Sequence, residues 1–234
     1  MGAHRACQPS RLARRPEGRL SLKTPLVILG TGVFAEEIAD LVAGSTEFDL
    51  VGFVEGVDRD RCAQPFLDLP VTWIEDIRSV TEISLAVCAV GSTRRERFIA
   101  EARAAGLRFA TLVHPGARVL PSATLAEGVI VSVGAVVGAR TRVGAHTILN
   151  RGCLVGHHVE IGRYVTLGPG ANIAAKVRIG DGTYVGMGAI VIDRVSIGSG
   201  CMIGAGAVVA RDLPDRVQAV GAPARVVRRN IERV

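Results

Sequence analysis

An aliphatic residue recurs at every sixth position of the chain from Val113 to Val209 without interruption. The positions are Val113, Val119, Leu125, Val131, Val137, Val143, Leu149, Val155, Ile161, Leu167, Ile173, Ile179, Val185, Val191, Ile197, Ile203 and Val209. A small or compact residue follows each of them by four positions, as at Ala135 and Cys153. Neither the 3.6-residue period of a helix nor the two-residue period of a strand explains this spacing.

A six-residue period predicts a parallel β-helix, in which each hexad forms one short strand and one turn. Three hexads close one triangular coil, so the seventeen hexads of residues 113–213 predict between five and six coils. The aliphatic residue should point into the prism, and the small residue should pack near its corner. Glycine directly follows the aliphatic residue in many hexads, as at Gly138 and Gly144. We expect these glycines to supply the unusual backbone angles of the turns.

Residues 24–112 show a different pattern, in which apolar runs alternate with stretches of helical spacing. This order predicts a Rossmann-like α/β unit, a parallel sheet with helices on both faces. Strands are predicted at 26–29, 50–54, 71–73 and 85–90, and helices at 33–42 and 94–105. The period breaks after residue 213, and we interpret residues 214–234 as a C-terminal cap.

The first predicted strand is followed by Gly30-Thr-Gly-Val-Phe-Ala35, a loose form of the dinucleotide-binding fingerprint. Glu55 ends the second strand, where an acidic residue would meet a ribose. Glycine lets a phosphate or sugar approach the backbone, and the helix start offers N–H groups to it. The motif fits a tight structural turn as well as a nucleotide site. A full NAD site is not expected, because residues 24–112 make at most half of the dinucleotide fold.

Charge and composition narrow the range of functions. The net charge is +6, but the first 23 residues hold +5 of it, which leaves +1 for the rest of the chain. A basic surface for nucleic acid is therefore not expected. No apolar run approaches the roughly 18 residues of a transmembrane helix, so we expect no membrane insertion. Residues 1–23 carry charge but no apolar segment, and we interpret them as a disordered basic leader and not as a secretory signal.

The cysteines and histidines offer few sites for metal. The five cysteines form no CxxC pair, which favours reduced, buried thiols in a cytoplasmic protein. Zinc would need three converging histidines, but His146 and His157 are eleven residues apart with no matching third, so no metal site is expected. His157 and His158 occupy a turn of the prism and can project outward. Such a histidine is usually only solvated, yet it can also act as a general base near neutral pH.

Several segments together resemble one family of enzymes. They are Gly30-Thr-Gly-Val-Phe-Ala35, Val51-Gly-Phe-Val-Glu55, Ala89-Val-Gly91, His114-Pro-Gly-Ala117, the hexads and Gly221-Ala-Pro-Ala-Arg225. Over residues 24 to about 230 the chain resembles the sialic-acid O-acetyltransferase and UDP-4-amino-sugar N-acetyltransferase family. The resemblance implies a left-handed β-helix after the Rossmann-like domain, a homotrimer, and active sites in the clefts between neighbouring prisms. Acetyl-CoA would be the acyl donor, and a nucleotide-linked or free sugar of surface-glycan biosynthesis would be the acceptor.

The resemblance also implies roles for individual residues. His157 falls on the catalytic histidine of the family, and Asn150 on an asparagine beside it. His157 would take a proton from the acceptor amine or hydroxyl, while turn N–H groups hold the oxyanion. The positions that would line the CoA cleft are Thr166, Ala175, Met187 and Ala205. The positions that would contact the sugar nucleotide are Gly32, Val33, Phe34, Glu55, Gly56 and Gly91.

Two residues depart from the pattern of the family. The catalytic histidine is usually followed by Asp or Glu, which orients the imidazole; here His158 stands there, and we expect that it cannot do so. Thr166 stands where the family often has a second histidine. Transfer to another small acceptor, or from a longer acyl donor, remains an alternative. A non-enzymatic alternative is a trimeric scaffold or sugar-nucleotide-binding protein, for which His158 is the main argument.

Overall fold

The computed structural model describes residues 23–79 and 84–232. Within these ranges the chain divides into two compact units. The first comprises the residues up to 90 together with 97–109, and the second comprises 91–96 together with the residues from 110 onward. The leader expected at residues 1–23 lies outside the described ranges except for its last residue.

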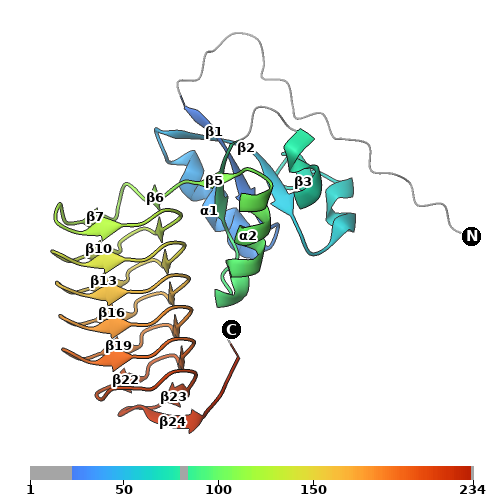
Figure 1. The fold of residues 1–234 in the computed structure, drawn as a ribbon. Coiled ribbons are helices and arrows are strands. Elements are labelled where there is room, and N and C mark those ends of the chain that lie inside the picture. The colour runs from blue at the N-terminus through green and yellow to red at the C-terminus, as the bar shows by residue number, and fades with distance from the viewer. Residues whose placement is uncertain (1–22, 80–83, 233–234) are drawn as a thin grey trace, which may run out of the picture. The chain divides into compact units, whose positions relative to one another are not determined.

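The first unit is built on a parallel sheet of five strands in the order β3-β2-β1-β4-β5 (Figure 1). The strands are β1 (Thr24–Leu29), β2 (Phe48–Glu55), β3 (Val71–Trp73), β4 (Leu85–Cys88) and β5 (Arg108–Phe109). The predicted parallel sheet is thus confirmed. All four side chains from Leu26 to Leu29 are buried, and for this reason β1 reads as a continuous apolar run instead of an alternating one.

Two α-helices and three 3-10 helices connect these strands. They are α1 (Val33–Ala43), η1 (Arg59–Ala63), η2 (Ile74–Ser79), η3 (Thr93–Arg95) and α2 (Glu96–Ala104). Helix α1 buries Ile38, Leu41 and Val42, the helical spacing from which it was predicted. The helix predicted over 94–105 begins with a tighter turn, η3, whose preceding residue Ser92 accepts a hydrogen bond from the Arg94 N–H at 3.1 Å.

The second unit is a left-handed parallel β-helix of seventeen two-residue strands, one for each hexad. They are β6 (Leu112–Val113), β7 (Arg118–Val119), β8 (Thr124–Leu125), β9 (Ile130–Val131), β10 (Val136–Val137), β11 (Arg142–Val143), β12 (Ile148–Leu149), β13 (Leu154–Val155), β14 (Glu160–Ile161), β15 (Thr166–Leu167), β16 (Asn172–Ile173), β17 (Arg178–Ile179), β18 (Tyr184–Val185), β19 (Ile190–Val191), β20 (Ser196–Ile197), β21 (Met202–Ile203) and β22 (Val208–Val209). Strands three hexads apart pair in parallel, as Val137 does with Val155, which confirms three hexads per coil.

The strands form three stacked sheets. The β13 sheet contains β7, β10, β13, β16, β19 and β22, and the β14 sheet contains β8, β11, β14, β17 and β20. The β15 sheet contains β6, β9, β12, β15, β18 and β21, and ends with β23 (Gln218–Val220) and the antiparallel β24 (Arg225–Arg228). From Val131 to Val209 every predicted aliphatic position is at most 5% exposed, so the predicted core is confirmed. Val113, Val119 and Leu125 are more exposed because they lie in the first coil.

The glycines that follow the aliphatic residues do not have the role expected of them. Left-handed backbone angles occur two residues later in the hexad, at Gly152 with φ 69° and also at the non-glycine residue His158 with φ 57°. Gly144 lies instead where successive coils touch, because an added Cβ would be 2.5 Å from the carbonyl carbon of Gly162. The close stacking of coils, and not the turn angle, therefore requires glycine at these positions.

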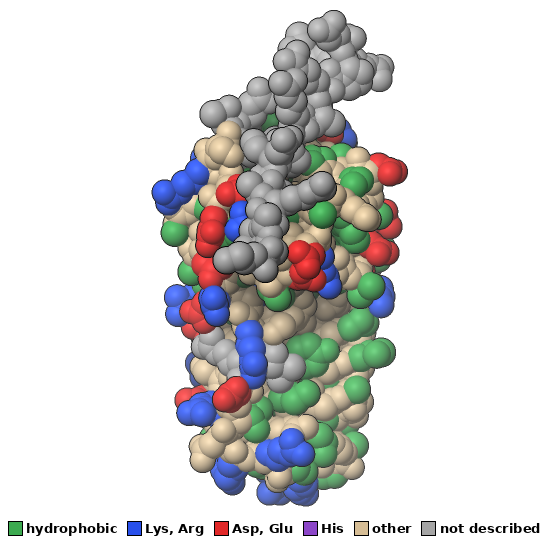
Figure 2. All heavy atoms as spheres, turned by 90° about the vertical axis from the view of Figure 1, so that its right-hand side faces the viewer, with side chains coloured by type: hydrophobic (Ala, Val, Ile, Leu, Met, Phe, Trp, Pro, Cys, Tyr) green, Lys and Arg blue, Asp and Glu red, His purple; other side chains and the backbone are tan. Residues whose placement is uncertain are grey.

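The outward residues give two of the sheets opposite characters, because side chains alternate between the two faces of a strand. The β13 sheet presents mostly apolar residues, among them Leu154, which is 45% exposed, and Ile190, which is 43% exposed, with Arg118 and Asn172 as exposed polar exceptions. The β14 sheet presents Arg142, Glu160 and Arg178, which are joined by ion pairs. Figure 2 shows apolar side chains along one side of the β-helix, and Lys and Arg side chains gathered over its C-terminal coils. Among the helices of residues 23–79 and 84–232, none has the length and apolar character needed to cross a membrane.

Candidate functional site

His157 and His158 lie in the exposed turn between β13 and β14. The backbone of this turn is fixed to both neighbouring coils. The His158 N–H donates to the Ala139 carbonyl at 2.9 Å, and the Lys176 N–H donates to the His157 carbonyl at 3.0 Å. The left-handed backbone at His158 turns the chain within a single residue. The two imidazoles are consequently presented to solvent by a rigid support.

The two imidazole rings contact each other edge to face, with centroids 5.1 Å apart and an interplanar angle of 86°. Their Nδ1 atoms are 3.0 Å apart, which is a hydrogen-bond distance. His158 is therefore within hydrogen-bond reach of the His157 imidazole, although it was not expected to orient that ring. A neutral imidazole carries one acceptor nitrogen, so His158 Nδ1 can accept the proton that His157 Nδ1 donates. Lacking a full negative charge, it stabilises the cation less than a carboxylate would.

Asn150 occupies a different turn from the histidine pair. It lies between β12 and β13, at the edge that the β13 sheet shares with the β15 sheet, whereas His157 lies at the edge shared with the β14 sheet. The Asn150 side chain is 9% exposed, and its Nδ2 donates to the Leu167 carbonyl in the next coil at 2.9 Å. Within one chain, the amide of Asn150 is thus engaged in coil stacking.

The positions expected to line the CoA cleft also fall on two edges. Ala175 follows His157 by one coil at the same edge, and its N–H donates to Asp193 Oδ1 at 3.2 Å. Met187 and Ala205 stack at the edge of Asn150, where the Gly206 N–H donates to the Met187 carbonyl at 2.8 Å. Met187 is 60% exposed and is available for contact with another molecule. The predicted site residues therefore form two groups, on opposite edges of the apolar β13 sheet.

Thr166 contacts Arg95, a buried residue that the sequence analysis did not single out. It is 3% exposed, its Oγ1 accepts from Arg95 Nη1 at 2.9 Å, and it donates to the Gly91 carbonyl at 3.3 Å. Arg95 itself is 2% exposed. No sequence motif marks Arg95, which stands among arginines in Arg94 to Arg97 with no sign of which one is buried.

In the first unit the carboxylate of Glu55 is buried and forms hydrogen bonds within the protein. Glu55 is 4% exposed; its Oε1 accepts from the N–H groups of Gly56 at 2.9 Å and Val57 at 2.8 Å, and its Oε2 accepts from Thr31 Oγ1 at 2.5 Å. These contacts tie the loop after β1 to the loop after β2. Gly56 has a packing role, because an added Cβ would lie 2.6 Å from the ring of Phe98.

A cavity of about 520 Å³ opens beside the start of α1. Its walls include Thr31, Gly32, Val33, Glu36, Arg61 and Phe66. Val33 is 85% exposed, and Phe34 is half-buried. Helix α1 begins at Gly32 without a side-chain cap, so its first N–H groups have no side-chain acceptor there.

Gly32 and Gly91 have open space where a side chain would be, unlike Gly56, the third glycine predicted to contact the substrate. An added Cβ at either position would meet nothing within 4 Å, and neither backbone has a left-handed φ. Neither packing nor backbone conformation thus requires glycine at these two positions.

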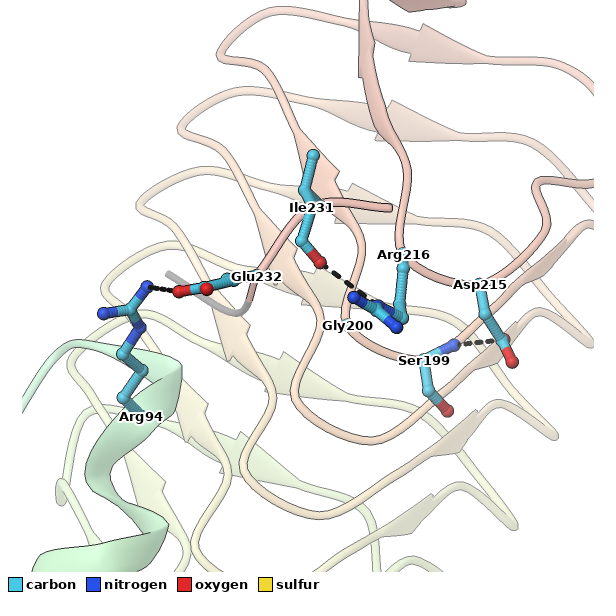
Figure 3. Close-up of a pocket in the computed structure, with 7 residues that line it drawn as sticks. All are labelled: Arg94, Ser199, Gly200, Asp215, Arg216, Ile231 and Glu232. Carbon is cyan, nitrogen blue, oxygen red and sulfur yellow. Dashed lines mark hydrogen bonds and ion pairs between the residues drawn. The ribbon is translucent and has the colours of Figure 1, made fainter. Parts of the chain in front are cut away.

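A second cavity, of about 420 Å³, lies at the C-terminal coils (Figure 3). It is lined by Arg94, Ser199, Gly200, Asp215, Arg216, Ile231 and Glu232. Figure 3 shows Arg94 pointing toward Glu232. Arg94 Nη2 lies 2.9 Å from Glu232 Oε2, and Arg216 Nε donates to the Ile231 carbonyl at 3.3 Å. Both guanidinium groups are thus engaged with the C-terminal segment, and we assign no ligand to this cavity.

The buried thiols of Cys153 and Cys201 are expected to be unreactive, because burial favours their protonated form. Burial raises the pKa of Cys153 to about 12, and it also raises the pKa of Cys201. A protonated thiol is a poor nucleophile and a poor metal ligand. Among residues 23–79 and 84–232, no three His, Cys, Asp or Glu side chains are grouped so as to hold a metal ion.

Comparison with known proteins identifies close relatives. A family model described as bacterial transferase hexapeptide (six repeats) matches residues 176–211. A histidine-to-asparagine variant of perosamine N-acetyltransferase from Caulobacter crescentus, solved with CoA and GDP-perosamine, is 32% identical with a TM-score of 0.81. That match covers 86% of this chain and 96% of the other. No relative was found among curated protein sequences.

A second relative is the acetyltransferase domain of PglB from Neisseria gonorrhoeae, solved with acetyl coenzyme A. It is 30% identical with a TM-score of 0.77, and the match covers 88% of this chain and 100% of that one. WeeI from Acinetobacter baumannii, at 24% identity and a TM-score of 0.80, shares the fold.

Proposed function

The chain belongs to the hexapeptide-repeat acetyltransferases, and from this premise we propose that it transfers the acetyl group of acetyl-CoA to an amino group of a nucleotide-linked sugar. The relatives support both substrates, since one was solved with CoA and GDP-perosamine and the other with acetyl coenzyme A. We further assign residues 24–112 to acceptor binding, 113–213 to the acyl donor and catalysis, and 214–234 to a cap.

The observation that carries the proposal is the contact between His157 and His158. In the catalytic arrangement His157 Nδ1 donates to His158 Nδ1 across 3.0 Å, which leaves His157 Nε2 as the basic nitrogen. That nitrogen takes a proton from the acceptor amine as the amine attacks the thioester carbonyl carbon. Turn N–H groups hold the oxyanion; then the carbon–sulfur bond breaks, and the imidazolium returns the proton to the departing thiolate.

The cavity beside α1 is the proposed acceptor site. The start of a helix favours negative charge and suits the diphosphate of a nucleotide sugar. Arg61 in the wall adds a cation, although it also pairs with Asp58 at 3.4 Å and the same wall contains Glu36 and Asp60. A ligand lying close to the backbone would explain glycine at Gly32 and Gly91, where the protein itself places nothing against an added Cβ.

A homotrimer would complete the site. His157 and Ala175 lie on one edge of the β13 sheet, and Met187 and Ala205 lie on the other. If the edges of neighbouring copies meet, the base of one chain faces the predicted CoA contacts of the next. The exposed apolar face between the edges, including Leu154 and Ile190, would then be covered. We place the enzyme in the cytoplasm, where reduced thiols such as Cys153 persist.

The test is release of CoA thiol from acetyl-CoA with a panel of UDP-, dTDP- and GDP-linked amino sugars. Acetylation of one of them, shown by mass spectrometry, is the expected result. No transfer to any of them, together with tight binding of a nucleotide sugar, would support the alternative, a binding or scaffold protein.

Mixed oligomers test whether the site is shared between chains. His157→Ala and Met187→Asp variants should each be weakly active. Co-expression of the two should restore part of the activity, because some interfaces then receive an intact residue from each chain. A monomer in light scattering, or no recovery in the mixture, would refute the shared site.

A further inference from the structure

Arg95 is a charged side chain placed almost wholly inside the second unit. It is 2% exposed, and a guanidinium removed from water is stable only when its donors are satisfied. Nε and Nη2 donate to the His146 carbonyl at 3.0 and 2.8 Å, and Nη2 also donates to the Val165 carbonyl at 2.8 Å. Nη1 donates to Thr166 Oγ1 at 2.9 Å and to the Ser92 carbonyl at 2.8 Å.

These bonds fasten residues 91–96 to two successive coils of the β-helix. His146 precedes β12, and Val165 precedes β15, the strand that pairs with β12 in the next coil. The Ser92 carbonyl is held through Arg95, and the Gly91 carbonyl accepts from Thr166 Oγ1. A planar guanidinium with five fixed donors can join several carbonyls at once, whereas an ammonium on a lysine cannot reproduce that geometry.

The fastened segment continues the loop that follows β4. In the order β3-β2-β1-β4-β5 the direction of strand addition reverses between β1 and β4, and ligands bind beyond the carboxyl ends of strands at such a point. Within the first unit the loops after these strands touch, because an added Cβ at Gly30 would lie 3.4 Å from Val90 Cγ2. Gly91, where packing leaves room for a ligand, is the next residue along the chain.

We propose that Arg95 is a positioning residue for the sugar-nucleotide acceptor: it holds residues 91–93 in the conformation that binds the acceptor. This role rests on the proposed acetyl transfer. Thr166, a predicted CoA-cleft residue that Arg95 contacts, is only 3% exposed and offers little surface to the acyl donor. Loss of Arg95 should therefore weaken acceptor binding more than donor binding.

Arg95→Lys and Arg95→Met test the proposal in the full-length protein, with Arg94→Ala as the matched control. Arg94 is the preceding residue, its side chain is 62% exposed, and it pairs with the exposed Glu232. Both Arg95 variants should raise the KM for the acceptor about tenfold or more, while the KM for acetyl-CoA changes less than about twofold. Arg94→Ala should leave both values near those of the wild type.

The melting temperatures of all three variants separate positioning from simple loss of stability. Arg95 variants that fold but lose kcat alone, or lose affinity for both substrates equally, would overturn the positioning role. Failure of both Arg95 variants to fold, with Arg94→Ala intact, would show that Arg95 serves stability only. A wild-type protein that transfers no acetyl group would instead overturn the proposed function, and the acceptor role of Arg95 with it.

Discussion

The Nδ1 atoms of His157 and His158 lie 3.0 Å apart, so a hydrogen bond between them requires one nitrogen to carry the proton and the other to accept it. A histidine base is commonly oriented by a carboxylate that accepts from its second nitrogen. Here the His158 ring stands in that place, at hydrogen-bond distance but without the negative charge of a carboxylate. The pair thus has the geometry of an oriented base without the full electrostatic support of one.

We expect His157→Ala to lower acetyl transfer about 100- to 10,000-fold, the usual effect of removing a positioned general base. His158→Ala should cost less, because it removes only the partner that selects the tautomer. Steady-state kinetics with the best acceptor provide the measurement. Full activity in His157→Ala, with loss only in His158→Ala, would mean that the two roles are reversed.

His158→Glu should keep or raise the activity. A carboxylate can accept the His157 proton as His158 does, and its charge also stabilises the imidazolium formed in the transition state. The backbone at residue 158 is left-handed, which glutamate adopts less readily than histidine, so the melting temperature of the variant must be measured beside its kcat. A folded His158→Glu protein with activity below that of His158→Ala would contradict this account.

Gly32→Ala and Gly91→Ala should leave the melting temperature nearly unchanged, because an added Cβ meets no protein atom within 4 Å. Each should nevertheless raise the KM for the sugar nucleotide, since the methyl group would occupy space proposed for the ligand. Gly30→Ala is the contrasting variant. Its φ of 102° disfavours alanine, so it should lower the stability itself. Unaltered acceptor binding in both of the first two variants would argue against the acceptor site.

Gly144→Ala should destabilise the β-helix by about 1–3 kcal/mol, because a Cβ placed 2.5 Å from the Gly162 backbone forces the coils apart. Gly152→Asn is the control. Gly152 has a φ of 69°, which asparagine tolerates, and no atom lies within 4 Å of an added Cβ. Denaturant unfolding compares the two, and equal stabilities would show that stacking does not determine the glycine positions.

Cys153 and Cys201 should resist alkylation in the folded protein. Their raised pKa values, about 12 for Cys153, keep them as neutral thiols, whereas the thiolate is the reactive form. Iodoacetamide at pH 8 should therefore label both only after unfolding, as mass spectrometry can show. The neutral Cys153 thiol also supports the fold fully below its unfolded pKa of about 9, and this support should disappear as the pH rises toward 12. Rapid labelling of native Cys153 would contradict its burial.

The β-helix was readable from the sequence alone, because each coil buries the same hexad positions and repeats one signal seventeen times. The aliphatic position of each hexad faces the prism, and the compact residue four positions later, as at Cys153 and Val165, fills the rest of the core. The parallel sheet of the first unit was equally readable, since its central strand is a continuous apolar run from Leu26 to Leu29. In both cases the residues that form the core are close in sequence or recur at a fixed period, so the hydrophobic pattern of the sequence predicts them.

Tertiary structure alone decided the features that join distant residues. It separated Asn150 from His157 by placing them on opposite edges of one sheet, and it turned the Glu55 carboxylate inward onto Thr31. It buried Arg95 from among neighbouring arginines, because that side chain reaches carbonyls more than fifty residues away. Which arginine reaches those carbonyls depends on how residues 91–96 pack against the coils, and no sequence period predicts that packing.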